Sequence, residues 1–243
     1  MTPIGHPINH SIMKNSLHSA LRLAPLFTVL ALALCVVGTT AWAGSLSVSV
    51  VDKEGKPVQD AVVIVLPANK TVLPKRALAA LATVNQEKMQ FIPSVTLVSV
   101  GAKVSFTNND PWDHHVRSSP AGLGQFNSTN EGFEIRLEGK SDGKAAKVSE
   151  VTLDKAGATG ATLLGCFIHA SMRGYIYASD SPWAAKTGAN GVAVFEDLPD
   201  GAAQVKLWQA DQLIEVPVQA AVVSNTPAQS TFQLTVVPRR RRS

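Results

Sequence analysis

The residue types that could do chemistry gather in one short segment and in a histidine pair upstream of it. Cys166, His169 and Met172 follow a Cys-x-x-His-x-x-Met spacing, and His114 and His115 stand next to each other earlier in the chain. A thiolate, two imidazoles and a thioether together form the donor set of mononuclear copper sites that transfer electrons. Three donors on a tight loop can converge on one ion, and the fourth must come from a neighbouring strand. The segment therefore predicts a copper site.

The same residues have two simpler interpretations. Cys166 could be a buried small apolar residue, His169 a surface residue and Met172 core filler. Zinc is the other alternative, but a thioether is a poor zinc ligand, and one cysteine with two histidines leaves a structural zinc site incomplete. The distribution of histidine and cysteine along the chain helps to choose among these interpretations.

Residues 1–43 are typical of an export signal. Two basic residues precede an apolar stretch over 24–37, and the small-x-small triplet at 41–43 offers a cleavage site before Gly44. The apolar stretch is shorter than the roughly 20 residues that a membrane span needs, so a retained anchor is the less favoured alternative. We expect a periplasmic protein, cleaved near Ala43 and left without a transmembrane anchor.

Cleavage concentrates the metal-binding residue types. The chain has 6 histidines and 2 cysteines, and those that lie after residue 43 are His114, His115, His169 and Cys166. An unpaired cysteine in an oxidising compartment is a liability unless it is buried or bound to a metal. The gathering of all four residues in two short segments favours the copper interpretation.

The charge balance gives no support for a nucleic-acid partner. The chain has 22 Lys and Arg against 18 Asp and Glu, a net charge of +4, and loss of the two basic residues before Gly44 lowers it to +2. So weak a balance gives no reason to expect nucleic-acid binding. The run Arg239–Arg242 forms a basic tail that we expect to be solvated; contact with an acidic partner or envelope surface is the alternative.

The exported chain is patterned as short strands and turns. Apolar residues alternate or cluster in short runs between turn residues, which favours an all-β chain built as β-sandwiches. The pattern predicts a hairpin in which 95–100 pairs with 104–106 around Gly101, and it allows one or two helical turns over 76–83. Further strands are expected at 46–50, 62–66, 114–117, 133–137, 150–153, 162–166, 175–178, 192–194, 205–207 and 230–237.

Several segments between about residues 84 and 178 share a known pattern. They are 91–93, 100–101, 104–108, 110–116 and the run Cys166-x-x-His169-x-x-Met172-Arg173-Gly174. This part of the chain resembles the cupredoxins, in the plastocyanin and amicyanin group, and the compact loop is of the amicyanin type. Within that group, it resembles the exported plastocyanin-like proteins labelled methylamine utilisation proteins. The resemblance implies a Greek-key β-sandwich.

The resemblance also implies roles for individual residues. His114, Cys166 and His169 become the equatorial ligands of one copper ion, and Met172 becomes the axial ligand. The choice of His114 over His115 rests on this resemblance, with weak support from strand alternation. His115 stands where many relatives have an asparagine that braces the ligand loop, so it could brace the loop instead or simply be exposed.

Apolar residues surround the second histidine of the motif. Phe167, Ile168 and Ala170 flank His169, and the resemblance implies that this imidazole reaches the surface through an apolar patch where redox partners dock. Packing of Phe167 and Ile168 in the core is the alternative. By resemblance alone, the partners would include an amine dehydrogenase or a c-type cytochrome.

The segments on either side resemble the two halves of another module. Residues 50–65 and 187–208 look like the opening and closing strands of a carboxypeptidase-regulatory-like, or transthyretin-like, Ig-type sandwich. We therefore expect five parts. They are a signal peptide (1–43), the first part of this sandwich with a linker (44–83), the cupredoxin domain (84–178), the second part of the sandwich (179–237) and a basic tail (238–243).

The function expected from these observations is that of a type 1 (blue) copper protein that carries single electrons between periplasmic partners. A copper carrier or sensor of the cell envelope is the alternative, although the open, Met-rich or His-rich sites of such proteins are missing, since only Met89 and Met172 remain after residue 43. A scaffold or adhesion role would leave the donor set unexplained. Multicopper enzymes need several more histidines, so we expect that the protein is not an enzyme.

Overall fold

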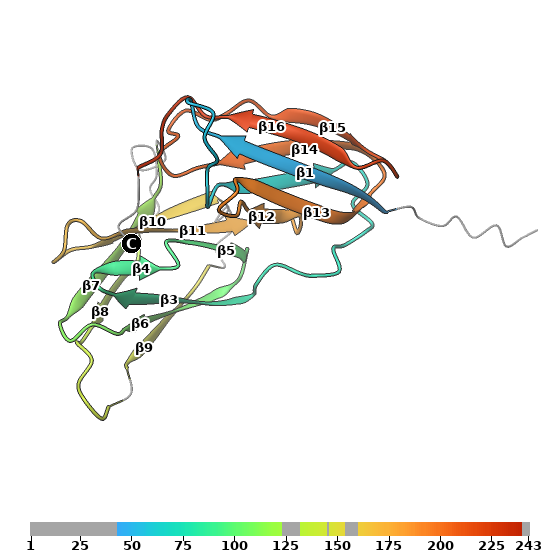
Figure 1. Cartoon of the computed structure of the whole chain (residues 1–243). Helices are drawn as coiled ribbons and strands as arrows, with labels where there is room; N and C mark the ends of the chain where they lie inside the picture. Colours follow the sequence, from blue (N-terminus) through green and yellow to red (C-terminus); the bar gives the residue numbers. More distant parts are fainter. Residues whose placement is uncertain (1–42, 123–131, 145, 154–159, 240–243) are drawn as a thin grey trace, which may run out of the picture. The chain divides into compact units, whose positions relative to one another are not determined.

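The structure is a computed structural model, and it describes residues 43–122, 132–144, 146–153 and 160–239. Every regular element in these residues is a β-strand (Figure 1). The all-β sandwich class expected from the alternation of apolar residues is confirmed. The expected leader lies outside the described residues except for Ala43, which begins the first strand, and the tail beyond Arg239 lies outside them as well.

The middle of the chain forms two facing sheets, which we call the central sandwich. One sheet has the order β5-β11-β10-β7-β8 and the other has the order β4-β3-β6-β9. The strands are β3 (Leu81–Glu87), β4 (Gln90–Ile92), β5 (Val95–Ser99), β6 (Lys103–Asn108), β7 (His114–Pro120), β8 (Glu134–Leu137), β9 (Val148–Thr152), β10 (Gly160–Cys166) and β11 (Arg173–Ser179). Alternate residues point into the shared core, as Val104 and Phe106 of β6 and Val116 of β7 do, because side chains alternate across a strand.

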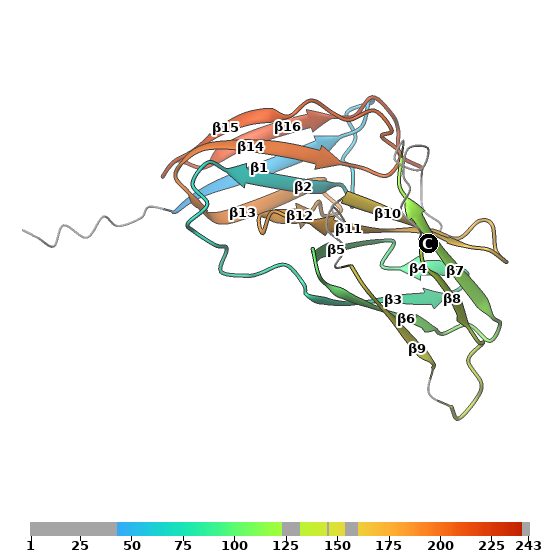
Figure 2. The ribbon, with the colours of Figure 1, turned by 180° about the vertical axis from the view of Figure 1, so that it is seen from behind.

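The segments before and after the central sandwich in sequence form a second pair of sheets, the flanking sandwich. Its sheets have the orders β13-β1-β16 and β12-β2-β14-β15, and Figure 2 shows β2 and β14 side by side, as their antiparallel pairing requires. The strands are β1 (Ala43–Val51), β2 (Val62–Pro67), β12 (Ala184–Lys186), β13 (Val192–Pro199), β14 (Gly201–Trp208), β15 (Gln219–Val223) and β16 (Ala228–Gln233). Leu46, Val63, Phe195 and Phe232 share its core, so both segments are needed to bury it.

A third apolar cluster joins the two sandwiches. Val62 of β2 is buried in the same cluster as Val95 of β5. The ring of Trp208 on β14 lies 5.5 Å, between centroids, from each of the rings of Tyr175 and Tyr177 on β11. The strand that follows the predicted ligand loop is therefore also a strand that contacts the flanking sandwich.

The hairpin predicted around Gly101 is wrong. β5 pairs in parallel with β11, whereas β6 pairs with β3 and β9, so the two strands belong to opposite sheets of the central sandwich. Gly101 has a φ of 84° at the turn that carries the chain from one sheet to the other. Both strands alternate because both face one core, and the alternation does not name a strand's partner.

The helical turns allowed over 76–83 are not formed. Residues 76–80 hold no helix, and β3 begins at Leu81. Residues Leu81 to Gln86 pair in parallel with Lys103 to Asn108 of β6. This pairing overrides the local preference of an alanine- and leucine-rich run for helix.

The search for membrane-spanning helices gave none in the residues that the structure describes.

Candidate metal centre

Two paired strands and one loop position the predicted ligands. β7 begins at His114 and β10 ends at Cys166, and the strands pair antiparallel with Cys166 opposite Val116. The loop after Cys166 carries His169 and Met172 before β11 begins. Strand pairing thus brings His114 and Cys166, which are 52 positions apart, to one end of the sheet.

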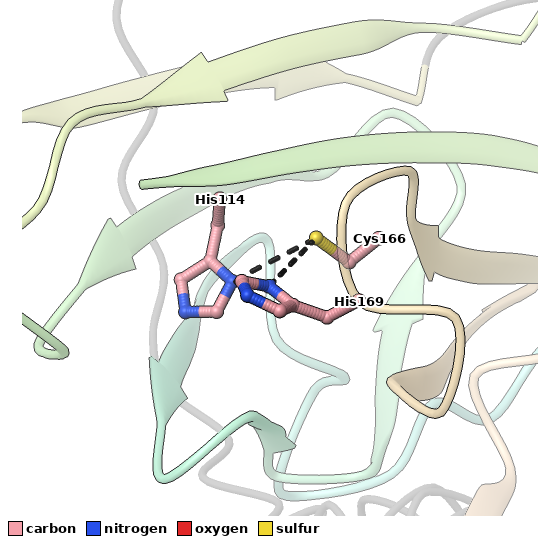
Figure 3. A group of neighbouring side chains, drawn as sticks. All are labelled: His114, Cys166 and His169. Atoms are coloured by element: carbon pink, nitrogen blue, oxygen red, sulfur yellow. Dashed lines mark hydrogen bonds between the residues drawn. The ribbon is translucent and has the colours of Figure 1, made fainter. Parts of the chain in front are cut away.

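The donor atoms of three predicted ligands face one another (Figure 3). Nδ1 of His114 lies 3.1 Å from Nδ1 of His169, and Sγ of Cys166 lies 3.7 Å and 3.5 Å from these two nitrogens. In the plane of the three atoms, the point equidistant from them lies about 2 Å from each. This is about the length of a metal–nitrogen bond, and an ion displaced slightly away from the sulfur would also reach the metal–thiolate length of about 2.3 Å. The three residues therefore fit a single metal ion.

The His114 ring is held by a buried carboxylate. Its Nε2 lies 2.9 Å from Oδ2 of Asp110, and both side chains are buried. Because an ionised carboxylate only accepts hydrogen bonds, the proton of the neutral ring is on Nε2, and Nδ1 presents its lone pair to Cys166 and His169. A carboxylate behind the imidazole is a common support of metal-binding histidines.

Asp110 is itself fixed by the turn between β3 and β4. Oδ1 accepts a hydrogen bond from the Lys88 amide at 2.6 Å, and Oδ2 accepts one from the Met89 amide at 3.0 Å. Lys88 and Met89 have φ values of 52° and 59°, a left-handed turn that directs both amides to the carboxylate. Burial raises the pKa of Asp110 and is the largest single influence, but the bonds from Met89, His114 and Lys88 together lower that pKa below its ordinary value. The group is a fixed negative charge behind the ring.

The sulfur is positioned by backbone amides at the junction of strand and loop. Cys166 is buried and forms no disulfide. The amide of His115 donates to its Sγ at 3.4 Å, and the amide of Phe167 donates to the carbonyl oxygen of His115 at 2.8 Å. The sulfur is thus contacted by one amide donor and by the two imidazole nitrogens.

Met172, the fourth predicted ligand, closes the loop. Its amide donates to the carbonyl oxygen of His169 at 2.9 Å, and its side chain is 1% exposed. It belongs to the same apolar cluster as Cys166. The structure therefore places a buried thioether at the end of the loop that carries two of the other donors.

His115 contacts the ligand loop from the outer face of β7. Its ring centroid is 5.8 Å from that of Phe167, and the guanidinium carbon of Arg117 lies 5.2 Å from the same ring centroid. Oε2 of Glu134 is 3.4 Å from His115 Nε2, and Oε1 is 2.7 Å from Arg117 Nε. His115 stands where the resemblance implies an asparagine that would brace the loop by hydrogen bonding. In this structure the half-buried His115 side chain contacts the loop through the ring of Phe167 instead.

The loop presents apolar surface around the second imidazole. Phe167 is 68% exposed and Ile168 is 55% exposed, so neither packs in the core. His169 is half-buried, and Ala170 is exposed. The His169 imidazole, whose Nδ1 faces His114 and Cys166, therefore lies next to exposed apolar side chains.

Asp110 is the site residue that sequence reasoning missed. It belongs to the segment 110–116 that carries the resemblance, but no role was assigned to it. The signal that could have found it is an acidic residue shortly before the histidine pair, in a segment broken by Pro111. That signal is weak, because the contact between Asp110 and His114 depends on how the segment between β6 and β7 folds, which the local sequence does not show.

The chain was compared with known proteins. No family model and no curated protein matches it. Among solved structures it is similar to a reduced amicyanin variant, with a TM-score of 0.32 and 18% identity over 49% of this chain and 99% of that chain. It is also similar to amicyanin from Paracoccus versutus, with a TM-score of 0.31 and 19% identity over 50% of this chain and 100% of that chain. A Cu(I) form of another amicyanin variant gives a TM-score of 0.32 and 18% identity over 49% and 99% of the two chains.

Proposed function

We propose that this protein is a cupredoxin-like type 1 copper protein that carries single electrons between partner proteins. The observation that carries the proposal is the triangle of His114 Nδ1, His169 Nδ1 and Cys166 Sγ, whose edges are 3.1 to 3.7 Å. Two imidazoles and one thiolate, with a thioether on the same loop, match blue-copper sites better than zinc sites. Met172 is the proposed axial ligand.

Copper held there would supply a one-electron change between Cu(I) and Cu(II). The chain holds the proposed ligands in fixed positions, and three of the four are buried. Asp110 sets the tautomer of His114, and the His115 amide faces the sulfur. The strands β7 and β10, which carry His114, His115 and Cys166, both pack in one core. Ligands that are already in place need little movement when the charge of the site changes.

The same residues suggest how electrons would enter and leave. His169 is half-buried next to the exposed side chains of Phe167 and Ile168. A small apolar surface of this kind suffices for a brief contact, because complexes between electron-transfer proteins bury little area. We infer that redox partner proteins dock here.

We also infer that the protein works in the periplasm. The export pattern of residues 1–43 supports this location, and so does Cys166, an unpaired cysteine that a metal would protect in an oxidising compartment. With a donor set that suits one ion and electron transfer, no catalytic role is proposed.

The proposal predicts that the chain from Gly44 onward becomes intensely coloured when Cu(II) is added. A visible absorption spectrum should show a strong thiolate-to-copper band, and Cys166→Ala should abolish it because the thiolate is removed. Met172→Leu should keep the band and the copper but shift the reduction potential, measured by voltammetry. A colourless copper complex in the unchanged protein would instead favour a copper carrier or sensor.

A further inference from the structure

A groove runs beside the proposed copper loop, between the two sandwiches. Its volume is about 530 Å³. The turn at Lys88 and Met89 and the loop segment 170–173 line it from the central sandwich, and 209–211 and 238–239 line it from the flanking sandwich. The flanking sandwich thus provides one wall of a recess whose other wall carries Met172.

The charged residues of the groove are mostly cationic. Lys88, Arg173 and Arg239 line it, and Asp211 is the one carboxylate among its lining residues. Asp211 is already satisfied, because the Arg239 amide donates to its Oδ2 at 3.0 Å and Arg239 Nε lies 3.8 Å from its Oδ1. Within the described part of the chain, the ionic groups of Lys88 and Arg173 are paired with no carboxylate. The groove therefore carries uncompensated positive charge.

The groove also has apolar lining. Met89 is 40% exposed there, and Ala170 and Pro238 add further apolar surface. A single inorganic anion would leave this surface uncovered. A peptide segment that carries several carboxylates could pair with the cations and cover the apolar positions, and the volume suits a few side chains.

Both segments of the central-sandwich wall are connected to the proposed ligands. The amides of Lys88 and Met89 hold Asp110, and Asp110 holds the His114 ring. The other segment of this wall, 170–173, includes Met172 itself. An occupant would therefore contact the supports of two of the four proposed ligands at once.

We propose that the groove binds an acidic segment of the partner protein and so sets how that partner is oriented on the copper site. The choice of occupant rests on charge complementarity, since Lys88 and Arg173 line the groove and are exposed and unpaired among the described residues. That this partner exchanges electrons rests on the proposed function, whereas binding of the acidic segment does not need copper.

The test uses the chain from Gly44 to Ser243 and a fluorescein-labelled hexaglutamate peptide, with binding followed by fluorescence anisotropy. The double variant Lys88→Gln, Arg173→Gln should bind the peptide about tenfold more weakly, because two ion pairs are lost. The control variant Lys70→Gln, Lys144→Gln removes the same charge from exposed lysines that do not line the groove, and it should bind the peptide nearly as the unchanged chain does. In the metal-free protein, the peptide should shift the amide NMR signals of 88–89 and 170–173.

Two further arms decide the identity of the occupant. A chain that lacks residues 240–243 should retain most of the peptide binding; loss in this truncation, with no loss in the Lys88→Gln, Arg173→Gln variant, would overturn the proposal. Vesicles that contain phosphatidylglycerol replace the peptide in the second arm. If the groove variant weakens vesicle binding but not peptide binding, the proposal is overturned in favour of an acidic membrane surface.

The outcome is independent of the copper test. A protein that turns blue but binds the peptide equally well in the groove and control variants overturns the groove proposal alone. A protein that stays colourless while the groove variant loses the peptide supports the groove and overturns electron transfer as its purpose.

Discussion

At the scale of single residues, the candidate centre depends on a relay of hydrogen bonds behind the metal-facing atoms. The Lys88 and Met89 amides hold Asp110, Asp110 holds Nε2 of His114, and Nδ1 is left to face Cys166 and His169. Each bond in this relay fixes the direction of the next group. The lone pair of His114 is therefore aimed at Cys166 and His169, and Asp110 is a positioning residue.

Replacing Asp110 by asparagine tests this relay. An amide cannot accept all three hydrogen bonds as the carboxylate does, and it removes the negative charge behind the ring, so Asp110→Asn should lower the copper affinity by about 10- to 100-fold. The affinity would be measured by competition with a chelator, and circular dichroism would show whether the fold is kept. Asp142→Asn, at an exposed turn, is the matched control and should leave the affinity unchanged. Equal affinities in the two folded variants would show that Asp110 does not position the ligand.

At the scale of the elements, β10 and β11 hold the two ends of the ligand loop. The second residue of β11 is Gly174, and its lack of a side chain lets β11 pack closely against Phe91. An added Cβ at this position would lie 2.8 Å from Cβ of Phe91. Phe91 is nearly fully buried in the central core and cannot move aside easily. On the neighbouring strand, an added Cβ at Gly165 would meet no atom within 4 Å. Gly165 pairs with Arg173 and Gly174 pairs with Leu164, so the two glycines occupy adjacent positions of the β10–β11 pair and differ in what they tolerate.

This difference predicts that the same substitution destabilises the protein at Gly174 and has little effect at Gly165. Gly174→Ala should lower the free energy of unfolding by about 1 to 3 kcal/mol, because the new methyl group overpacks the core against Phe91. Gly165→Ala is the matched control and should change the free energy of unfolding by less than about 0.5 kcal/mol. Urea unfolding of the metal-free proteins measures both values. Similar losses in the two variants would mean that the contact with Phe91 does not limit the packing of β11.

At the scale of the whole molecule, the described chain is two sandwiches that share an apolar contact. The chain enters the flanking sandwich through β1 and β2, forms the central sandwich, and returns through β12 to β16. Val62, Val95 and the rings of Tyr175, Tyr177 and Trp208 form the contact between them. The flanking sandwich therefore reaches the strand that leaves the ligand loop, and it also supplies a wall of the groove.

The contact predicts a change of stability in alkaline solution. Burial, aided by the charges of Asp180 and Glu215, raises the pKa of Tyr177 above 10.0. The unfolded chain therefore loses this proton first, so the stabilising contribution is complete below about pH 10 and disappears as the pH rises through the raised pKa. Tyr177→Phe should have nearly the same free energy of unfolding as the unchanged protein at pH 7 and should lose less of it at pH 11. Urea unfolding at both pH values tests this, and parallel losses in the two proteins would contradict it.

Much of the strand pattern could be predicted from local sequence. Alternating residues such as Leu46, Val48 and Val50 mark a strand and its buried face, and the expected strands near 62–66, 114–117 and 162–166 are all present. Two predictions failed for the same reason. The partner of β5 and the conformation of the run before β3 are decided by distant strands, which a local pattern does not reveal.

The sequence by itself determined which residue types are available for chemistry: one cysteine and three histidines after residue 43, and Met172 close after two of them. Only the tertiary structure decided that the donor atoms of His114, Cys166 and His169 form a triangle, that Asp110 stands behind it and that a cationic groove lies beside it. The physical reason is that these features depend on strand pairing and packing between residues far apart in the chain. Composition and spacing specify the donors, whereas long-range contacts specify where they meet.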